Sequence, residues 1–354
     1  MRARRNVAAI ALVAAVTGCG LLTACGPDKG HAVGASPAAS SSFSGKGASA
    51  GAGGASPQPS ASANGSGSGS GGTTAAPVAL NGTGGTLLTI SNGTSHVLMN
   101  GASVDFGVTV RDLNWSPDGR KAIFIDGNGN LDSANPDGSG RITVARNPGN
   151  QTWSHPTWQA PADRAEFREV NIAKIFFVAN GGGVTQLMSV PAERADGAPA
   201  LLSLGNYAGA NVAQLPQTGN IWINGGGGNG TTVYANTGTG EVYLRDDYIR
   251  QQGAANTNGS EPALIPGTGG EPGGIVFVRS VAGHDHVFVE EFTNSGRPVR
   301  DLTPNATTDY TEPAVSPDGR TVALRTPNGV AVVPLNGSAA PRPVSTTPGL
   351  PAYR

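Results

Sequence analysis

Short apolar runs separated by Gly, Asn and Asp occupy the chain from about Ala75 to its end. Each run has the length of a strand, contains β-branched or aromatic residues and is bounded by turn-forming residues, which is the pattern of β-strands. No long stretch has a helical period, and Ala162–Lys174, which comes nearest, is interpreted as a loop. The pattern predicts an all-β domain over residues 75–354. The clearest runs are Lys121–Ile125, Lys174–Val178, Gly274–Val278, His286–Val289 and Thr321–Leu324.

A repeated motif leads into several of these runs. Ser116–Arg120 and Ser316–Arg320 both read Ser-Pro-Asp-Gly-Arg, and each precedes an apolar run. Weaker copies lie between and after them. Aligned on one position, the series is Trp115, Trp158, Gln214, Leu264, Val315 and Tyr353, with steps of 43, 56, 50, 51 and 38 residues. Because four-stranded propeller blades repeat at roughly 40–50 residues, the six copies predict a six-bladed β-propeller.

Tight turns rich in Gly, Asn and Asp form a second series that runs in step with the first. These residues tolerate the positive φ angles that hairpin turns need. The turns are Ser91–Gly93, Asn135–Gly140, Arg194–Gly197, Asn236–Gly240, Thr293–Gly296 and Asn336–Gly337.

The two ends of the domain are predicted to share one blade. The chain stops just after the sixth anchor, Tyr353, so the other three strands of that blade have to come from the start of the domain. Pro77–Leu80, Gly85–Ile90 and His96–Met99 are the candidates. A ring closed by strands from both termini leaves no open sheet edge.

The repeat resembles a known family. Ser-Pro-Asp-Gly-Arg before an apolar strand, followed by Asn-Pro-Asp-Gly-Ser-Gly at Asn135–Gly140, is similar to the WD40-like repeat of TolB-type six-bladed propellers. The resemblance covers residues 75–354 and implies the same fold. TolB-type proteins also carry an α/β domain before the propeller, whereas this chain has only a Gly- and Ser-rich segment there. The Ser-Pro-Asp-Gly turns are interpreted as structural.

The first residues have the features of an export signal. Arg2, Arg4 and Arg5 precede the apolar run Val7–Val16, which is too short to span a bilayer. Leu22–Cys25 then resembles a bacterial lipobox, in which the Cys becomes lipid-modified. Residues 1–24 are therefore predicted to be a lipoprotein signal peptide, and Cys25 to anchor the protein at the extracytoplasmic face of the cell membrane. Cys19 is the alternative site of modification.

Residues 25–74 are nearly all Gly, Ala, Ser and Pro. Such a segment cannot bury enough apolar surface to offset its ordering entropy, so it is predicted to be a disordered tether. Gly47–Gly51 matches the Gly-x-Ser-x-Gly hydrolase pattern but lacks the strand and helix of a nucleophile elbow. Both Cys residues lie in the first 25 positions, so the domain beyond them has no disulfide.

Composition narrows the classes of protein further. The 354 residues include 54 Gly and 26 Pro, which argues against a helical bundle. The formal net charge of -1 argues against a nucleic-acid-binding protein, which typically carries an excess of positive charge.

Candidate chemistry in the domain is sparse, and each motif has a structural interpretation. His284–His286 resembles part of a metal site but follows Gly283 at a predicted hairpin. Asp126–Asp132 resembles a calcium loop but has Leu131 where such loops need Gly. Trp115 and Trp158 are assigned to packing between blades. The acid pairs Asp246–Asp247 and Glu290–Glu291 are assigned to strands, in which adjacent side chains face opposite ways. The Gly-rich run Gly225–Gly230 is assigned to a flexible hairpin.

From this sequence we expect a lipid-anchored, extracytoplasmic scaffold propeller that binds an envelope protein or polymer without catalysing a reaction. We assign no catalytic residue, metal ligand or cofactor, and we expect a monomer. The alternative is a propeller lyase or hydrolase acting on an envelope polymer or peptide, with His284 or His286 at the channel. A cluster of His and carboxylates facing the central channel would favour the enzyme, and a channel lined by Gly, Thr and Asn would favour the binder.

Overall fold

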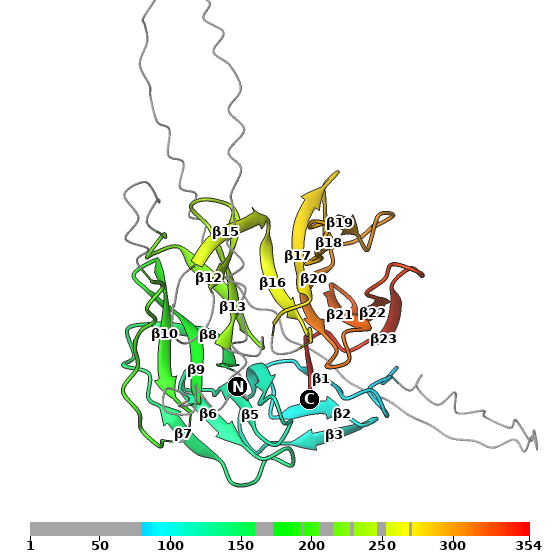
Figure 1. The fold of residues 1–354 in the computed structure, drawn as a ribbon. Coiled ribbons are helices and arrows are strands. Elements are labelled where there is room, and N and C mark those ends of the chain that lie inside the picture. The colour runs from blue at the N-terminus through cyan, green and yellow to red at the C-terminus, as the bar shows by residue number, and fades with distance from the viewer. Residues whose placement is uncertain are drawn as a thin grey trace, which may run out of the picture. The chain divides into compact units, whose positions relative to one another are not determined.

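The structure is a computed structural model that describes residues 79–159, 173–192, 194–205, 215–226, 230–245, 253–268 and 271–354. All of them belong to the compact unit Gly72–Arg354. In this part of the chain, 24 strands form six four-stranded antiparallel sheets, and no helix is present (Figure 1). The predicted all-β, six-bladed propeller is therefore confirmed. Several predictions concern segments that lie outside the described residues: Cys19, Cys25, the signal and tether over residues 1–74, most of Ala162–Lys174, Gln214 and Asp246–Asp247.

The six blades follow one another along the chain, and each has four strands that lie side by side from the axis outward. From its innermost strand, blade 1 is β4 (Arg111–Trp115), β5 (Ala122–Ile125), β6 (Leu131–Ala134) and β7 (Ile142–Ala145). In the same order, blade 2 is β8 (Thr152–Gln159), β9 (Lys174–Gly181), β10 (Val184–Pro191) and β11 (Ala200–Leu201). Blade 3 is β12 (Asn220–Gly225), β13 (Thr232–Asn236), β14 (Glu241–Arg245) and β15 (Gly253–Asn258). Blade 4 is β16 (Ser260–Ile265), β17 (Gly274–Val281), β18 (His284–Glu291) and β19 (Val299–Asp301). Blade 5 is β20 (Thr311–Val315), β21 (Thr321–Thr326), β22 (Gly329–Pro334) and β23 (Arg342–Ser345). Blade 6 is β24 (Leu350–Tyr353), β1 (Leu88–Ser91), β2 (His96–Met99) and β3 (Ala102–Asp105).

The ring closes as the sequence predicts, through a blade built from both ends of the domain. β24 pairs with β1 in antiparallel register, and each inner strand contacts the inner strands of the two flanking blades, including β24 with β4. One predicted strand is wrong: the fourth strand of this blade is β3 and not Pro77–Leu80. The chain just after Leu80 instead extends blade 5, because Asn81 forms a β-bridge with Ser345 and Gly82 N–H donates to the Val344 carbonyl.

Two details of the repeat alignment also differ from the prediction. The third inner strand is β12, and the residue in it equivalent to Trp115 is Gly225, so the alignment on Gln214 is wrong. The error arises because blade 3 has neither the Ser-Pro-Asp-Gly motif nor the Pro that lies two residues before the aligned position in blades 2, 4, 5 and 6. The predicted turns all connect strands, but two of them, Ser91–Gly93 and Asn236–Gly240, join the second and third strands of their blades, whereas the other four join the third and fourth.

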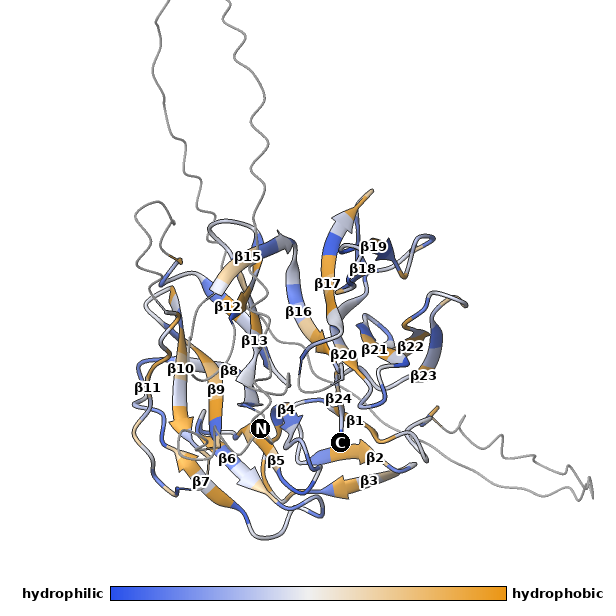
Figure 2. Cartoon of the chain, viewed as in Figure 1, coloured by the Kyte–Doolittle hydropathy of each residue, from blue (hydrophilic) through white to orange (hydrophobic). Residues whose placement is uncertain are grey.

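The hydrophobic core lies between neighbouring blades. Apolar residues follow the strands, as on β2, β9 and β10, while the turns are mostly polar (Figure 2). Trp115 of blade 1 is 5% exposed and lies in one hydrophobic cluster with Ala352 of blade 6. Trp158 of blade 2 is 8% exposed and lies in one cluster with Ile123 and Ile125 of blade 1. The inter-blade packing predicted for these two Trp residues is confirmed. In the part of the chain that the structure describes, no helix is long and apolar enough to cross a membrane.

The Ser-Pro-Asp-Gly turns have the structural role that was predicted. In the first copy, Ser116 Oγ donates to Asp118 Oδ1 over 2.6 Å, and the same oxygen accepts the Arg120 N–H over 3.1 Å. Gly119 has a φ of 66°, which an L side chain rarely adopts. The second copy, Ser316–Arg320, repeats these bonds with the same distances.

Candidate functional site

The inner strands carry the same irregularity in five of the six blades. β4, β8, β12, β16 and β20 each contain a register shift against the second strand of the blade. Each shift places one non-glycine residue at a φ of about +50°: Asp112 (52°), His155 (51°), Trp222 (50°), Glu261 (49°) and Glu312 (50°). Such bulges re-aim a side chain and are common beside functional sites.

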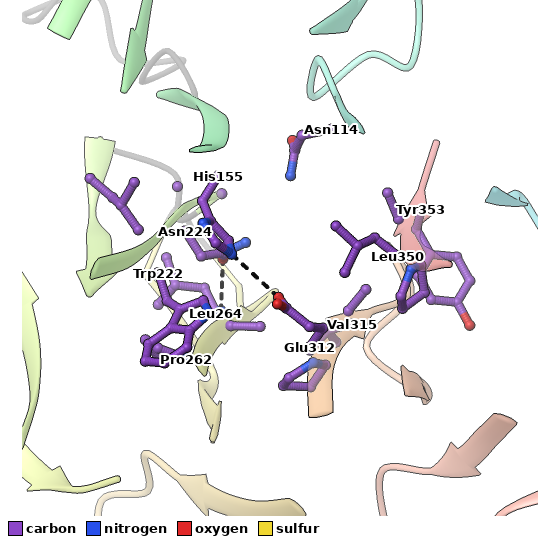
Figure 3. Close-up of a pocket in the computed structure, with 18 of the residues that line it drawn as sticks. Asn114, His155, Trp222, Asn224, Pro262, Leu264, Glu312, Val315, Leu350 and Tyr353 are labelled. Carbon is purple, nitrogen blue, oxygen red and sulfur yellow. Dashed lines mark hydrogen bonds and ion pairs between the residues drawn. The ribbon is translucent and has the colours of Figure 1, made fainter. Parts of the chain in front are cut away.

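The five bulge residues face one cavity at the centre of the ring. Residues of all six inner strands line it, and its volume is about 220 Å³. Figure 3 shows His155 and Trp222 on one side of this space, Glu312 reaching toward His155, and Leu350 and Tyr353 on the opposite side. A His, three carboxylates and a Trp therefore converge from five separate blades, each separated from the next in sequence by tens of residues.

Side chains of one blade satisfy backbone N–H groups of the next. The Asp112 carboxylate accepts the His155 N–H over 3.2 Å, and the Glu261 carboxylate accepts the Glu312 N–H. Between blades 3 and 4, Asn224 Oδ1 accepts the Leu264 N–H over 3.0 Å. Asp112 and Glu261 thus have a structural role, since an unpaired buried N–H is costly.

The imidazole of His155 and the carboxylate of Glu312 accept no hydrogen bond from a backbone N–H of the described residues and instead lie next to each other. His155 Nε2 lies 3.5 Å from Glu312 Oε2, an ion-pair distance if the His is protonated (Figure 3). Both ring nitrogens of His155 are buried, and neither has a polar partner other than Glu312 in the part of the chain that the structure describes. Burial by itself would lower the pKa of His155, but Glu312, Asp112 and Glu261 outweigh it, and the pKa is raised.

Glu261 is the most strongly perturbed carboxyl group of the cavity. Burial, together with the charge of Glu312, raises its pKa to about 7, against the opposing hydrogen bond from the Glu312 N–H. The pKa of Tyr353, across the cavity, is also raised by burial, so its phenol stays neutral near pH 7. Perturbed acids in a concave site are typical of functional sites.

The sequence does contain a signal for this cluster, separate from the motifs singled out above. In three of the inner strands the bulge residue directly precedes a Pro, as in His155-Pro156, Glu261-Pro262 and Glu312-Pro313. A Pro is tolerated in a strand at an edge or a bulge, because it cannot donate to the ladder. The residue before each repeated Pro thus marks the position that turns toward the axis, and three of these residues are titratable.

The motifs singled out by sequence lie elsewhere in the propeller. His284 and His286 are on β18, the third strand of blade 4, so the expectation that either would stand at the channel is wrong. His284 Nδ1 lies 3.3 Å from Asp309 Oδ1, and His286 Nδ1 lies 2.8 Å from Asp301 Oδ2. Among the described residues, no group of three or more His, Cys, Asp or Glu side chains is arranged to hold a metal ion.

The remaining candidates have structural roles where the structure describes them. Asp126 Oδ1 accepts the N–H groups of Asn128 and Asn130, each over 2.8 Å, within the hairpin between β5 and β6. Asp132 is fully buried and pairs with Arg141 at 2.8 Å. The Gly225–Gly230 run connects β12 to β13, with its central residues outside the described part. Glu290 is 3% exposed, and its neighbour Glu291 is partly exposed, as expected for adjacent positions of a strand.

Comparison with known proteins supports the fold. No protein-family model matches the chain, and no curated protein matches it. The structure of TolB from Acinetobacter baumannii is similar to this chain with a TM-score of 0.51 and 12% identity, over 75% of this chain and 65% of TolB. The chain thus matches somewhat less than two thirds of the length of TolB. An oligogalacturonate lyase in complex with manganese (TM-score 0.41, 12% identity, 69% of this chain and 68% of that one) and the tricorn protease (TM-score 0.41, 14% identity, 74% and 26%) are more distant.

The described residues therefore form a TolB-like six-bladed β-propeller. At 12% identity the likeness to TolB concerns the fold, and function has to be argued from the channel.

Proposed function

We propose that this protein is an extracytoplasmic scaffold propeller that binds an envelope protein or polymer at its central channel without catalysing a reaction. The observation that carries the proposal is the convergence of the bulge residues on one cavity lined by all six blades. A concave site with a few convergent polar groups is the usual form of a ligand site. The rigid ring holds these groups in place from separate blades, which favours a preorganised binding surface.

The chemistry of the cavity explains how a ligand would be held. Asp112 and Glu261 are engaged by backbone N–H groups of the next blade, which fixes their orientation. Trp222 is partly exposed and lines the cavity together with Leu350 and Tyr353, which supply apolar contact area. Glu312 remains as a polar group that lines the channel and has no backbone N–H to satisfy among the described residues.

A specific observation also favours the alternative, a propeller lyase or hydrolase. A channel-facing set of His and carboxylates is present, although its residues are His155, Glu261 and Glu312 and not those expected from the sequence. A carboxyl group with a pKa of about 7 beside an imidazole has the properties of a general acid–base pair.

Affinity capture with the full chain separates the two functions. We expect a partner from an envelope extract to be retained by the wild type and by Glu291→Gln on β18, an ion-paired surface Glu outside the cavity. We expect Trp222→Ala to reduce capture at least tenfold, because truncation of a buried aromatic contact typically costs about 2 kcal/mol or more. Equal capture by the wild type and Trp222→Ala would contradict a binding role for the channel. Turnover of a wall polysaccharide or peptide that is lost in Glu312→Gln would establish the enzyme instead.

We propose further that Cys25 anchors the chain to the membrane through attached lipid. The proposal is supported by the lipobox-like residues Leu22–Cys25 and the apolar run before them. Because two acyl chains give stable attachment where one is marginal, Cys25→Ser is expected to move the protein from the membrane fraction to the medium. Cys19→Ser, the matched control, is expected to stay in the membrane fraction. Incorporation of labelled lipid into Cys25→Ser would contradict the assignment.

A further inference from the structure

We infer that the channel cluster of Glu261, Glu312, His155 and Trp222 is a site for an organic cation, the protonated amine or guanidinium group of a ligand. The inference rests on the proposed binding function and specifies the chemistry that the channel recognises. It is carried by three features of the described residues: the balance of charge, the set of hydrogen-bond acceptors and the aromatic wall.

The cavity holds more negative than positive groups. Three carboxylates, Asp112, Glu261 and Glu312, line it from three different inner strands, and His155 is the one group there that can carry a positive charge. No Lys or Arg is among the described residues that line it. Carboxylates gathered in a confined space lack the compensation that a bound cation supplies.

The carboxylates that line the cavity are hydrogen-bond acceptors in their ionised form. Ionised carboxylates accept hydrogen bonds and donate none. Nε2 of His155 lies 3.5 Å from Glu312 Oε2, and neither buried ring nitrogen has a polar partner other than Glu312 within the described ranges. An ammonium or guanidinium group carries donors and no acceptor, so it is complementary to this set.

Trp222 adds a contact that distinguishes organic cations from metal ions. It lines the same cavity, and its ring centroid lies 6.2 Å from that of His155 (Figure 3). The face of a Trp ring attracts Lys-like, Arg-like and quaternary ammonium groups. A divalent metal ion needs several ligands at one point, and the described residues contain no such group of His, Cys, Asp or Glu.

Titration calorimetry on the full chain with butylguanidinium, butylammonium, calcium chloride and neutral butanol tests the inference. We expect one or both organic cations to bind, and butanol and calcium not to bind. Glu312→Gln is expected to weaken cation binding by about tenfold to a hundredfold, the equivalent of one charge-assisted hydrogen bond. Glu291→Gln, outside the cavity, is the matched control and is expected to bind as the wild type does.

The affinity is also expected to rise between pH 6 and pH 8. Over this range Glu261, with its pKa of about 7, loses its proton and makes the cavity more negative. The raised pKa of His155 means that His155 keeps its positive charge to a higher pH than an ordinary imidazole does. Asp112 on β4 and Glu312 on β20 are the other carboxylates that face the cluster, Asp285 on β18 adds a more distant negative charge, and Tyr353 on β24 stays neutral. In Glu261→Gln this dependence on pH should be smaller.

Three results would overturn the inference: no binding of either cation, equal binding of butanol, or calcium binding that Glu312→Gln removes. Trp222→Leu provides a second variant if Glu312→Gln fails to fold, and weaker cation binding in it supports the site. Failure of this inference is distinguishable from failure of the proposed function. A partner captured through the channel without any cation binding would leave the function in place and reject the ligand class. Cation binding in a chain that captures no partner would keep the ligand class and reject the proposed function.

Discussion

Removal of Leu350–Arg354 is expected to abolish the cooperative unfolding transition of the propeller. This segment contains β24, the inner strand of blade 6, which is bound to β1 in register from Leu88–Tyr353 to Ser91–Leu350. Its loss exposes the edge of β1 and opens the ring between blades 5 and 1. The expected destabilisation is comparable to the whole stability of a typical domain, about 5–15 kcal/mol.

The contacts of the last residues explain why five positions have so large an effect. Thr89 Oγ1 donates to the Ala352 carbonyl over 2.9 Å and accepts from Trp115 Nε1 over 2.9 Å, so β24, β1 and β4 share one buried network. Arg354 Nε donates to the Gly119 carbonyl over 2.9 Å, and its guanidinium lies 5.7 Å from the Trp115 ring centroid. The terminus therefore joins blade 6 to blade 1.

Thermal unfolding followed by circular dichroism measures the effect of the truncation. Leu350→Ala is the matched control, because it keeps the backbone pairing of β24 and removes a partly exposed side chain. We expect the control to unfold in a single transition close to that of the wild type. A truncated chain that unfolds at the wild-type temperature would show that blade 6 does not depend on β24.

Phe277→Ala is expected to destabilise the propeller by about 3–5 kcal/mol, the usual cost of removing a buried aromatic side chain. Phe277 on β17 is fully buried and packs with Val233, Leu264 and Ile275 in the cluster between blades 3 and 4. The Phe277 ring stacks on Phe288, with 5.9 Å between the ring centroids, and the Arg279 guanidinium lies 4.7 Å from the centroid of the Phe277 ring. The substitution removes both ring contacts and leaves a cavity between the blades.

Denaturant unfolding measures this change. Val281→Ala on the same strand is the control, since Val281 is 39% exposed and is expected to change stability by less than about 0.5 kcal/mol. Equal effects of the two substitutions would contradict the assignment of the core to the spaces between blades.

Much of the fold could be predicted from local sequence, because its signals are local. The two Ser-Pro-Asp-Gly-Arg copies specify turns whose hydrogen bonds span at most five residues, as between Ser116 Oγ and the Lys121 N–H. The apolar runs that follow them, such as Thr321–Leu324, became second strands of blades. Blade 3 has neither this motif nor a Pro in its inner strand, and there the alignment failed: the inner strand is β12 and not a strand around Gln214.

The candidate site could not be found in the same way. His155, Glu261 and Glu312 are separated by 106 and 51 positions, and each by itself is an isolated polar residue before a Pro. The sequence motifs with metal-like or calcium-like spacing proved to belong to hairpins and outer strands, because close spacing in sequence is as typical of a turn as of a site.

The sequence by itself determined the strands, the turns, the number of blades and their closure by both ends of the domain. These features depend on hydrophobic period and on turn chemistry, which act over a few residues. The tertiary structure decided which residues meet at the axis. A one-residue bulge in each of five inner strands turns Asp112, His155, Trp222, Glu261 and Glu312 toward a common cavity. The charge of Glu312 that helps to raise the pKa of Glu261 acts only when blades 4 and 5 are assembled. A Pro after the bulge residue marks three of these positions locally, but their convergence around one axis is a property of the closed ring.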